Sequence, residues 1–143
     1  MRFRIFIDKE HEEEILIYVH EKTPLVEKIE KLISDDTFEL IGYKDREAVR
    51  LCTNDVVCFV AEDNKVFAMT ESEKFNLRFR LYQIEDNLSD NFIRINQSCI
   101  ANINKIDRFD ASISGTLVVR FKNGYRDFVS RRQMKNIKER FGL

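Results

Sequence analysis

The pattern of apolar and polar residues first predicts two strands and a helix. Charged and apolar residues alternate over residues 2–7, and residues 15–20 are mostly β-branched or aromatic, so both segments are expected to be strands. A helix is predicted next, because Thr23 can cap its first turn and Pro24 fits the first helical position. Its apolar residues recur at helical spacing, and its end is expected at Asp35-Asp36.

After residue 38 the pattern changes to short apolar runs at regular spacing. Many short strands of this kind are typical of a β-rich α+β body with few, short helices. We therefore interpret residues 1–37 as a strand–strand–helix extension that dimerises the protein or receives a signal, and residues 38–143 as one domain. The predicted strands are 38–43, 48–52, 56–61, 65–70, 75–80, 92–95, 99–103, 116–121 and 125–129, with one short helix over 81–88.

Two pairs of residues indicate hairpin turns. Asp63-Asn64 lies between two predicted strands, and Asn123-Gly124 is the stronger signal, because both central residues of a two-residue hairpin turn need positive φ. The chain closes with a predicted helix, Arg131–Phe141. Ser130 is expected to begin this helix as a capping residue and Gly142 to end it.

Charge divides the chain unevenly, although the whole carries a net charge of only −1. Residues 1–90 contain 13 Lys or Arg against 21 Asp or Glu, a net of −8, whereas residues 91–143 contain 11 against 4, a net of +7. A basic segment of this kind suggests a polyanionic partner. The alternative is a solvated surface on which the two halves attract each other.

No arrangement of residues predicts catalysis. His11 and His20 have no Cys or Asp at zinc-binding spacing, and the chain contains no glycine-rich phosphate loop and no nucleophile elbow. We expect neither an enzyme nor a cofactor, metal or small-molecule substrate. Cys52, Cys58 and Cys99 are odd in number and no signal peptide precedes them, so reduced thiols in the cytoplasm are the simplest interpretation.

Arg131 and Arg132 oppose the expected dipole of the closing helix. Cations at the first two helical positions cost about 0.3–1 kcal/mol each. Residues that destabilise their own helix without a compensating contact nearby often mark a functional site. The two guanidinium groups are therefore expected to face phosphates or guanine edges. The alternative is that they pair with acidic side chains nearby, namely Asp107, Asp110 or Asp127.

Three segments together resemble the signature of the LytTR DNA-binding domain family. FIRINQSCIANINKI (92–106) resembles the F-x-R element, polar loop and I/V-x-N element of the family. LVVRFKNGYRDFVSRRQMKNIKERFG (117–142) resembles its Asn-Gly hairpin, V-S-R turn and closing helix, and DVVCFVAEDNKVFAMT (55–70) resembles its first hairpin. The resemblance covers roughly residues 38–143. It implies a ten-stranded, mostly antiparallel β-fold that grips duplex DNA by loops along one edge.

The resemblance also implies which residues contact DNA. Gln97 departs from the family pattern, where Lys or Asn is common, so this loop keeps its reach but lacks a charge. Arginine can bind guanine through two hydrogen bonds, glutamine and asparagine can do so with adenine, and lysine suits phosphates. The expected contacts are Asp63, Asn64 and Lys65 in the first turn, Asn96, Gln97 and Ser98 in the polar loop, Arg131, Arg132 and Lys135 at the closing helix, and Lys105.

These observations predict a cytoplasmic transcription regulator that binds a specific duplex site, as a homodimer, by inserting loops into successive grooves. Residues 1–37 look like the extension of stand-alone members of the family, which can be paired with a small membrane protein. The alternative is a protein-interaction module whose basic edge binds an acidic partner.

Overall fold

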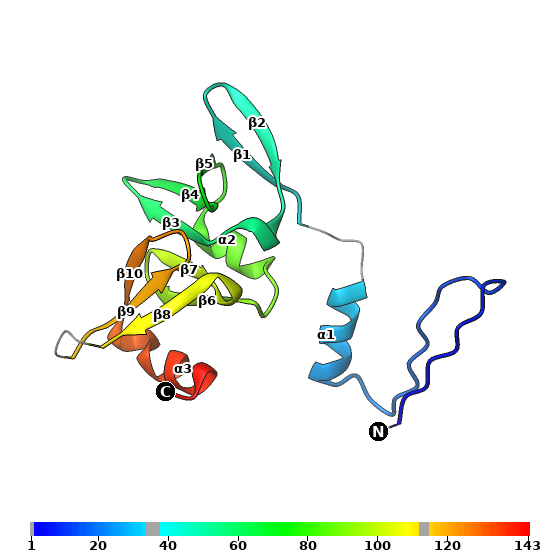
Figure 1. Cartoon of the computed structure of the whole chain (residues 1–143). Coiled ribbons are helices and arrows are strands. Elements are labelled where there is room, and N and C mark those ends of the chain that lie inside the picture. Colours follow the sequence, from blue (N-terminus) through cyan, green and yellow to red (C-terminus); the bar gives the residue numbers. More distant parts are fainter. Residues whose placement is uncertain (1, 34–37, 112–114) are drawn as a thin grey trace. The chain divides into compact units, whose positions relative to one another are not determined.

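The chain forms two compact units, Met1–Thr37 and Phe38–Leu143, which are considered separately (Figure 1). The computed structural model describes residues 2–33, 38–111 and 115–143. The expected end of the first helix at Asp35-Asp36 lies outside the described residues.

The N-terminal unit contains the expected helix, α1 (Pro24–Ile33), but not the two expected strands. Thr23 caps the helix, since its Oγ1 accepts a hydrogen bond from the Val26 backbone N–H at 3.4 Å. Residues 2–23 double back on themselves without forming a strand (Figure 1). The prediction of strands at 2–7 and 15–20 was therefore wrong. Alternation alone does not suffice, because a two-stranded ribbon is at best marginally stable without a third strand or a covering layer.

The N-terminal unit leaves an unusual number of large apolar side chains exposed. On α1, Val26 is buried, whereas the apolar side chains of the preceding segment face solvent. Exposed apolar surface of this extent usually marks a surface that contacts another molecule. The exposed large apolar residues of this unit are Phe3, Ile5, Phe6, Ile7, Ile15, Leu16, Ile17, Tyr18, Val19, Leu25, Leu32 and Ile33.

The larger unit contains ten antiparallel strands, which confirms the expected β-rich class and strand number. Seven strands form one sheet in the order β2-β1-β5-β4-β3-β7-β6, and three form a second sheet in the order β10-β9-β8. The strands are β1 (Leu40–Lys44), β2 (Glu47–Leu51), β3 (Cys58–Glu62), β4 (Lys65–Met69), β5 (Lys74–Leu77), β6 (Phe92–Asn96), β7 (Cys99–Asn102), β8 (Ile106–Asp110), β9 (Leu117–Phe121) and β10 (Arg126–Val129).

Two short helices and two 3₁₀ turns complete this unit. The helices are α2 (Leu81–Asp86) and α3 (Arg131–Phe141), and the turns are η1 (Thr53–Asp55) and η2 (Ile103–Lys105). The bounds of α3 are those expected. Ser130 Oγ accepts a hydrogen bond from the Gln133 backbone N–H at 3.3 Å, and Gly142 ends the helix with φ of 67°.

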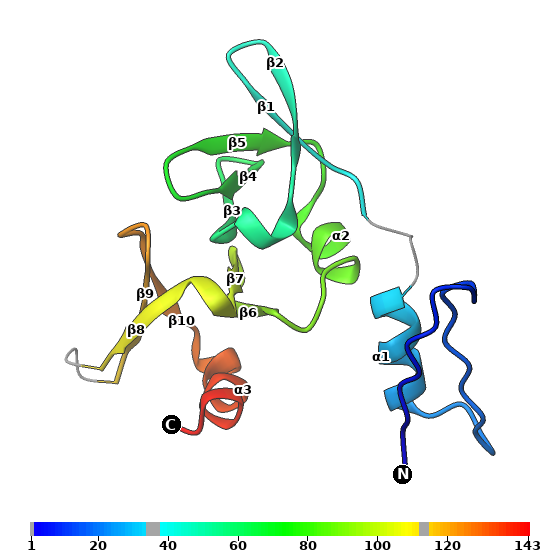
Figure 2. The same ribbon diagram turned by 45° about the vertical axis from the view of Figure 1, so that its right-hand side comes forward.

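The central strands β3 and β7 of the large sheet are buried on both faces. On one face, Cys58, Val60 and Cys99 pack with Val119 of the second sheet and Ile137 of α3. On the opposite face, Phe59 and Ile100 pack with Leu81 and Ile84 of α2. Figures 1 and 2 show the second sheet and α3 together, apart from α2. The structure thus fixes β3, β7 and β6 rigidly between two cores.

Both predicted hairpins form, but one has a different turn. Asp63 and Asn64 have φ of 49° and 62°, as a two-residue turn of type I′ requires. In the second hairpin only Gly124 has positive φ, at 89°. The Phe121 N–H donates a hydrogen bond to Tyr125 O at 2.9 Å, so the loop between these paired residues contains three residues, 122–124. Such a loop needs a left-handed conformation only at its last residue. The expectation of positive φ at Asn123 was therefore wrong.

The residue pattern did not predict β8 (Ile106–Asp110). Its ladder with β9 shifts register between Ile106 and Arg108, so the alternation of apolar and polar residues is interrupted after one residue. Of its five side chains only Ile106 and Phe109 are half-buried. The tenth strand was implied by the family resemblance and not by the pattern.

Candidate nucleic-acid interface

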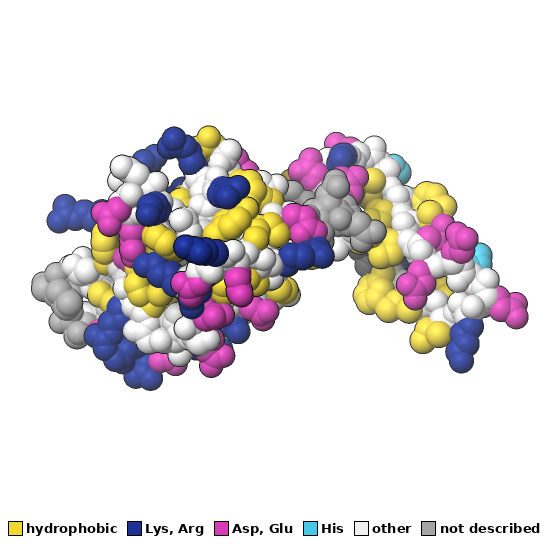
Figure 3. Space-filling view, turned by 90° about the horizontal axis from the view of Figure 1, so that it is seen from above, with side chains coloured by type: hydrophobic (Ala, Val, Ile, Leu, Met, Phe, Trp, Pro, Cys, Tyr) yellow, Lys and Arg dark blue, Asp and Glu magenta, His cyan; other side chains and the backbone are white. Residues whose placement is uncertain are grey.

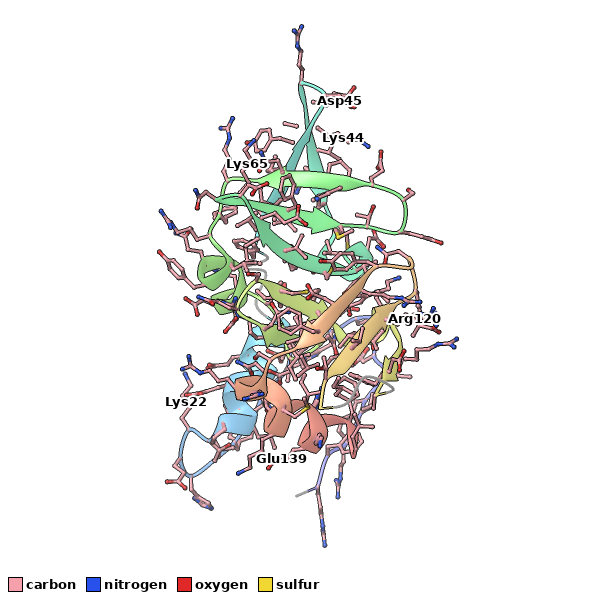
Figure 4. The ribbon with its side chains drawn as sticks, turned by 90° about the vertical axis from the view of Figure 1, so that its left-hand side faces the viewer. Lys22, Lys44, Asp45, Lys65, Arg120 and Glu139 are labelled. Carbon is pink, nitrogen blue, oxygen red and sulfur yellow. The ribbon has the colours of Figure 1, made fainter. Side chains whose placement is uncertain are left out.

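Two backbone hydrogen bonds bring three separate segments to one edge of the larger unit. The Ala61 N–H at the end of β3 donates to Ser98 O at 2.9 Å, which places the β6–β7 turn beside the β3–β4 turn. The Ser130 N–H donates to Ile95 O at 2.9 Å, which places the start of α3 beside the end of β6. We call this edge, formed by residues 63–65, 96–98 and 130–132, the rim. It lies to the left in Figure 1 and faces the viewer in Figure 4.

The first segment of the rim is the tip of the β3–β4 hairpin. Asp63, Asn64 and Lys65 are all exposed there, and Lys65 projects from the start of β4 (Figure 4). Of the two acidic side chains beside it, Glu62 is neutralised by an ion pair of 2.9 Å with Lys74, whereas Asp63 is exposed in the turn. Lys65 is therefore the free cation of this turn among the described residues.

The second segment is organised around Asn96, which is buried rather than exposed. Its side chain is 3 % exposed. Its Nδ2 donates to Asp127 Oδ1 at 2.9 Å and to Phe128 O at 2.8 Å, and its Oδ1 accepts from the Ser98 N–H at 2.7 Å. The first two bonds tie the β6–β7 turn to β10, and the third closes the turn itself. Asn96 thus positions the turn, while Gln97 and Ser98 are exposed at its tip.

Asp127 and Tyr125 of the β10 hairpin complete this network. Tyr125 Oη donates to Asp127 Oδ2 at 3.1 Å, and the Phe128 N–H donates to Asp127 Oδ1 at 2.8 Å. Burial raises the pKa of Tyr125 above its ordinary value, and the nearby Asp127 charge adds to the effect. Tyr125 therefore stays neutral and keeps donating its proton to the carboxylate throughout the physiological range.

Arg94 supports the same turn from its other side. Its Nη1 donates to Gln97 O at 2.8 Å, while its Nε pairs with Glu85 Oε2 of α2 at 2.6 Å. The side chain of Arg94 is only 22 % exposed, so it connects the turn to α2 and is not free to bind a ligand. The backbone of Gln97 is consequently held between β10 and α2, and its side chain is left free.

The third segment presents Arg131 and Arg132 at the start of α3. Both are exposed, and neither forms an ion pair within the described part of the chain. Two of the carboxylates that could have neutralised them are occupied, since Asp107 pairs with Arg108 at 2.8 Å and Asp127 binds Tyr125 and Asn96. The two guanidinium groups therefore remain available to a ligand.

The structure separates the other two lysines expected at the interface, Lys135 and Lys105. Lys135 is exposed one turn along α3 from Arg131 and lies 4.0 Å from Glu139. Lys105 instead ends η2, beyond the far end of β7, where its backbone O accepts a hydrogen bond from the Lys122 N–H at 2.9 Å. Lys105 is thus at the opposite end of the strands from the rim.

Sequence reasoning did not identify Arg94, Asp127 or Tyr125 as parts of this site. The roles of Asp127 and Tyr125 depend on a contact between segments 31 residues apart, Asn96 with Asp127, and the role of Arg94 depends on its ion pair with Glu85 of α2. The only sequence signal was the F-x-R element that contains Arg94.

The described residues offer little else that could act as a site. They contain no group of three or more His, Cys, Asp or Glu that could hold a metal ion. Nor does that part of the chain form a helix with the length and apolar character needed to cross a bilayer.

Comparison with known proteins shows which chains this protein resembles. Two Staphylococcus aureus proteins from strains MSSA476 and NCTC 8325, each described as an uncharacterized HTH-type transcriptional regulator, are 33 % and 32 % identical to this chain. Each alignment covers 100 % of this chain and 99 % of the relative. No two consecutive helices form a helix-turn-helix in the described part of Phe38–Leu143, where five strands separate α2 from α3.

A solved LytTr DNA-binding domain from Bacillus cereus has the same fold. It superposes with a TM-score of 0.69 at 22 % identity, covering 74 % of this chain and 99 % of that domain. The sequence model described as the LytTr DNA-binding domain matches residues 46–142. The chain therefore belongs to the LytTR family of DNA-binding domains.

Proposed function

We propose that this protein is a transcription regulator that binds a specific site on duplex DNA through the rim. The observation that carries the proposal is the pair of backbone hydrogen bonds, Ala61 to Ser98 and Ser130 to Ile95, that aligns three solvent-facing segments. Family membership and the names of the relatives support the same function.

The spacing of these segments suits two adjacent grooves. From β4 through β3 and β7 to β6 there are three steps between neighbouring strands, or roughly 14 Å at a strand spacing of about 4.8 Å. The start of α3 then lies beside β6, through the hydrogen bond from the Ser130 N–H to Ile95 O. Half a turn of B-DNA is about 17 Å, since a full turn rises about 34–36 Å. The β3–β4 turn and the start of α3 can therefore enter successive grooves on one side of a duplex, with the β6–β7 turn between them.

The side chains divide into two roles. Gln97, Arg131 and Arg132 carry hydrogen-bonding groups that match base edges, so they are proposed to read sequence. Lys65 and Lys135 are proposed to bind phosphates, which set register and affinity. Asn96, although expected at the interface, is proposed to act only by holding Gln97 in place, because its own amide is fully engaged.

Substitution of Arg132 by alanine tests the proposal. The specific DNA affinity should fall by about 1–3 kcal/mol, the usual contribution of one base-reading contact. A site selected from a random duplex library supplies the probe, and fluorescence anisotropy at fixed salt measures the affinity.

Arg50→Ala is the matched control, because Arg50 is an exposed arginine on β2 whose side chain is 79 % accessible and pairs with Glu39. It should leave the affinity unchanged. Equal affinities for the wild type, Arg132→Ala and Arg50→Ala would remove Arg132 from the interface, and failure to select any site would refute the proposed function.

The N-terminal unit is proposed to make protein contacts. Its apolar side chains are too numerous for an isolated solvated surface, so we propose that two copies pair through them, or that a small membrane protein covers them as a regulator. The proposed compartment is the cytoplasm, where the three free cysteines of the structure would stay reduced.

A second candidate function is a protein-interaction module whose basic edge binds an acidic partner. The exposed, unpaired Arg131 and Arg132 fit such a partner as well as they fit DNA. Retention of sheared genomic DNA on a gel distinguishes the two, because only a DNA-binding protein would show retention that weakens with added salt.

A further inference from the structure

Three arginines from three strands lie in one row across the second sheet. The ladder of β9 with β10 places Arg120 opposite Arg126, and the ladder of β8 with β9 places Arg120 opposite Arg108. All three belong to the outer face, since their neighbours Val119 and Phe121 turn into the core. We call these residues the arginine row.

The arginine row is poorly neutralised. Arg108 pairs with Asp107 at 2.8 Å, but in the described part of the chain neither Arg120 nor Arg126 has an acidic partner. Like charges directly opposite each other destabilise a sheet. Figure 4 shows Arg120 projecting outward from the sheet, and Figure 3 shows Lys and Arg side chains on several parts of the surface of the larger unit, with Asp and Glu among them.

We propose that the arginine row binds the phosphate backbone of the same duplex that the rim reads, on the flank of the groove entered by the start of α3. The inference rests on the proposed function. It adds a second contact surface that the family resemblance does not assign.

The distance between the arginine row and the rim fits this arrangement. β10 joins them directly, because Arg126 is its first residue and Ser130 follows its last. Four residues of extended chain span roughly 13 Å at about 3.3 Å per residue. The major groove is about 8.5 Å deep. When the tip of a turn reaches the floor of the groove, the phosphates at the groove edge therefore lie about 8.5 Å from that tip, beside the body of the protein. The long arginine side chains can cover the remaining few ångströms.

Arginine is also the chemically suitable residue. A guanidinium group is always charged and can bind a phosphate through two parallel hydrogen bonds. Adjacent strands are about 4.8 Å apart, so the arginine row spans roughly 10 Å. Phosphates repeat every 3.4 Å along the axis on each DNA strand, so flexible side chains on this row can contact two of them.

The test is the salt dependence of DNA binding by the double variant Arg120→Gln, Arg126→Gln. The control is Arg46→Gln, Arg50→Gln, which removes two exposed arginines from the β1–β2 hairpin at the far end of the large sheet. The probes are a selected site with long flanks and a random-sequence duplex of equal length. The thermal unfolding transition of each variant is also measured, to establish that the variant is folded.

We expect the slope of log affinity against log salt to become shallower by about two for the arginine-row variant, since each lost phosphate contact contributes about 0.9. The selected sequence should stay the same, and the control should keep the wild-type slope. A wild-type slope in the folded arginine-row variant would overturn the inference alone and leave the proposed function standing. If the wild type binds neither probe, both fail.

An acidic protein partner gives a different result. In that case the arginine-row variant would bind DNA with the wild-type slope but would no longer bind a glutamate-rich peptide that the wild type retains. That outcome would also overturn the inference.

Discussion

Replacement of Asn96 by alanine is the most informative single perturbation of this structure. The side chain makes three hydrogen bonds of 2.7–2.9 Å and is 3 % exposed. A typical hydrogen bond contributes about 0.5–1.5 kcal/mol net, and a buried group left without a partner costs more. Alanine would leave Phe128 O and the Ser98 N–H unsatisfied, although Asp127 would keep its bonds from Tyr125 and Phe128.

We therefore expect Asn96→Ala to lower the free energy of unfolding by about 2–4 kcal/mol. The measurement is urea denaturation followed by circular dichroism, with the midpoint compared at constant slope. Specific DNA affinity should fall as well, because the β6–β7 turn loses its attachment to β10 and Gln97 is no longer held at the rim.

Gln97→Ala is the matched control for this experiment. Its side chain is exposed, and only its backbone O accepts a hydrogen bond, from Arg94. Surface substitutions of this type usually change stability by no more than about 0.5 kcal/mol. Gln97→Ala should therefore weaken DNA binding without destabilising the fold. The reasoning would be refuted if Asn96→Ala unfolded within about 0.5 kcal/mol of the wild type.

Two further predictions concern charge and assembly. Gln97→Lys should tighten binding to non-specific DNA and steepen the slope of log affinity against log salt by about one, because it adds one cation at an exposed turn. Anisotropy titrations at several salt concentrations measure this slope. An unchanged slope would mean that the turn faces away from the duplex. Replacing the exposed apolar side chains Phe3, Ile5 and Ile7 by serine should convert a dimer to a monomer, because burial of these side chains drives the proposed pairing. Sedimentation equilibrium measures the oligomeric state. A wild type that is already monomeric at all concentrations would exclude pairing through this surface.

The larger unit shows how closely local pattern and structure agree when each strand is fixed by its neighbours. The nine predicted strands, α2 and the bounds of α3 follow from alternation, turn residues and capping. The strands predicted at 38–43 and 56–61 begin only at Leu40 and Cys58, and the strand predicted at 75–80 ends at Leu77. Gly42 of that strand illustrates a feature that pattern cannot reveal. A Cβ at this position would lie 2.6 Å from Phe75 Cβ, so the close approach of β1 to β5 requires glycine.

The sequence alone was misleading where stability depends on a partner layer. Residues 2–7 and 15–20 alternate like strands, yet among the described residues no third strand pairs with them, and they remain irregular. Conversely, β8 has a weak pattern but forms because β9 pairs with it and Phe109 packs edge-on against Phe141 of α3 at a centroid separation of 4.8 Å.

By itself, the sequence determined the local elements, the basic character of residues 91–143 and the family signature, because each depends on residues near one another in the chain. Only the tertiary structure decided which candidates act together. It buried Asn96, moved Lys105 to the opposite end of the strands and left Arg131 and Arg132 unpaired at the rim. The physical reason is that hydrogen bonds and ion pairs between distant segments, such as Asn96 with Asp127, determine which polar groups remain free for a ligand.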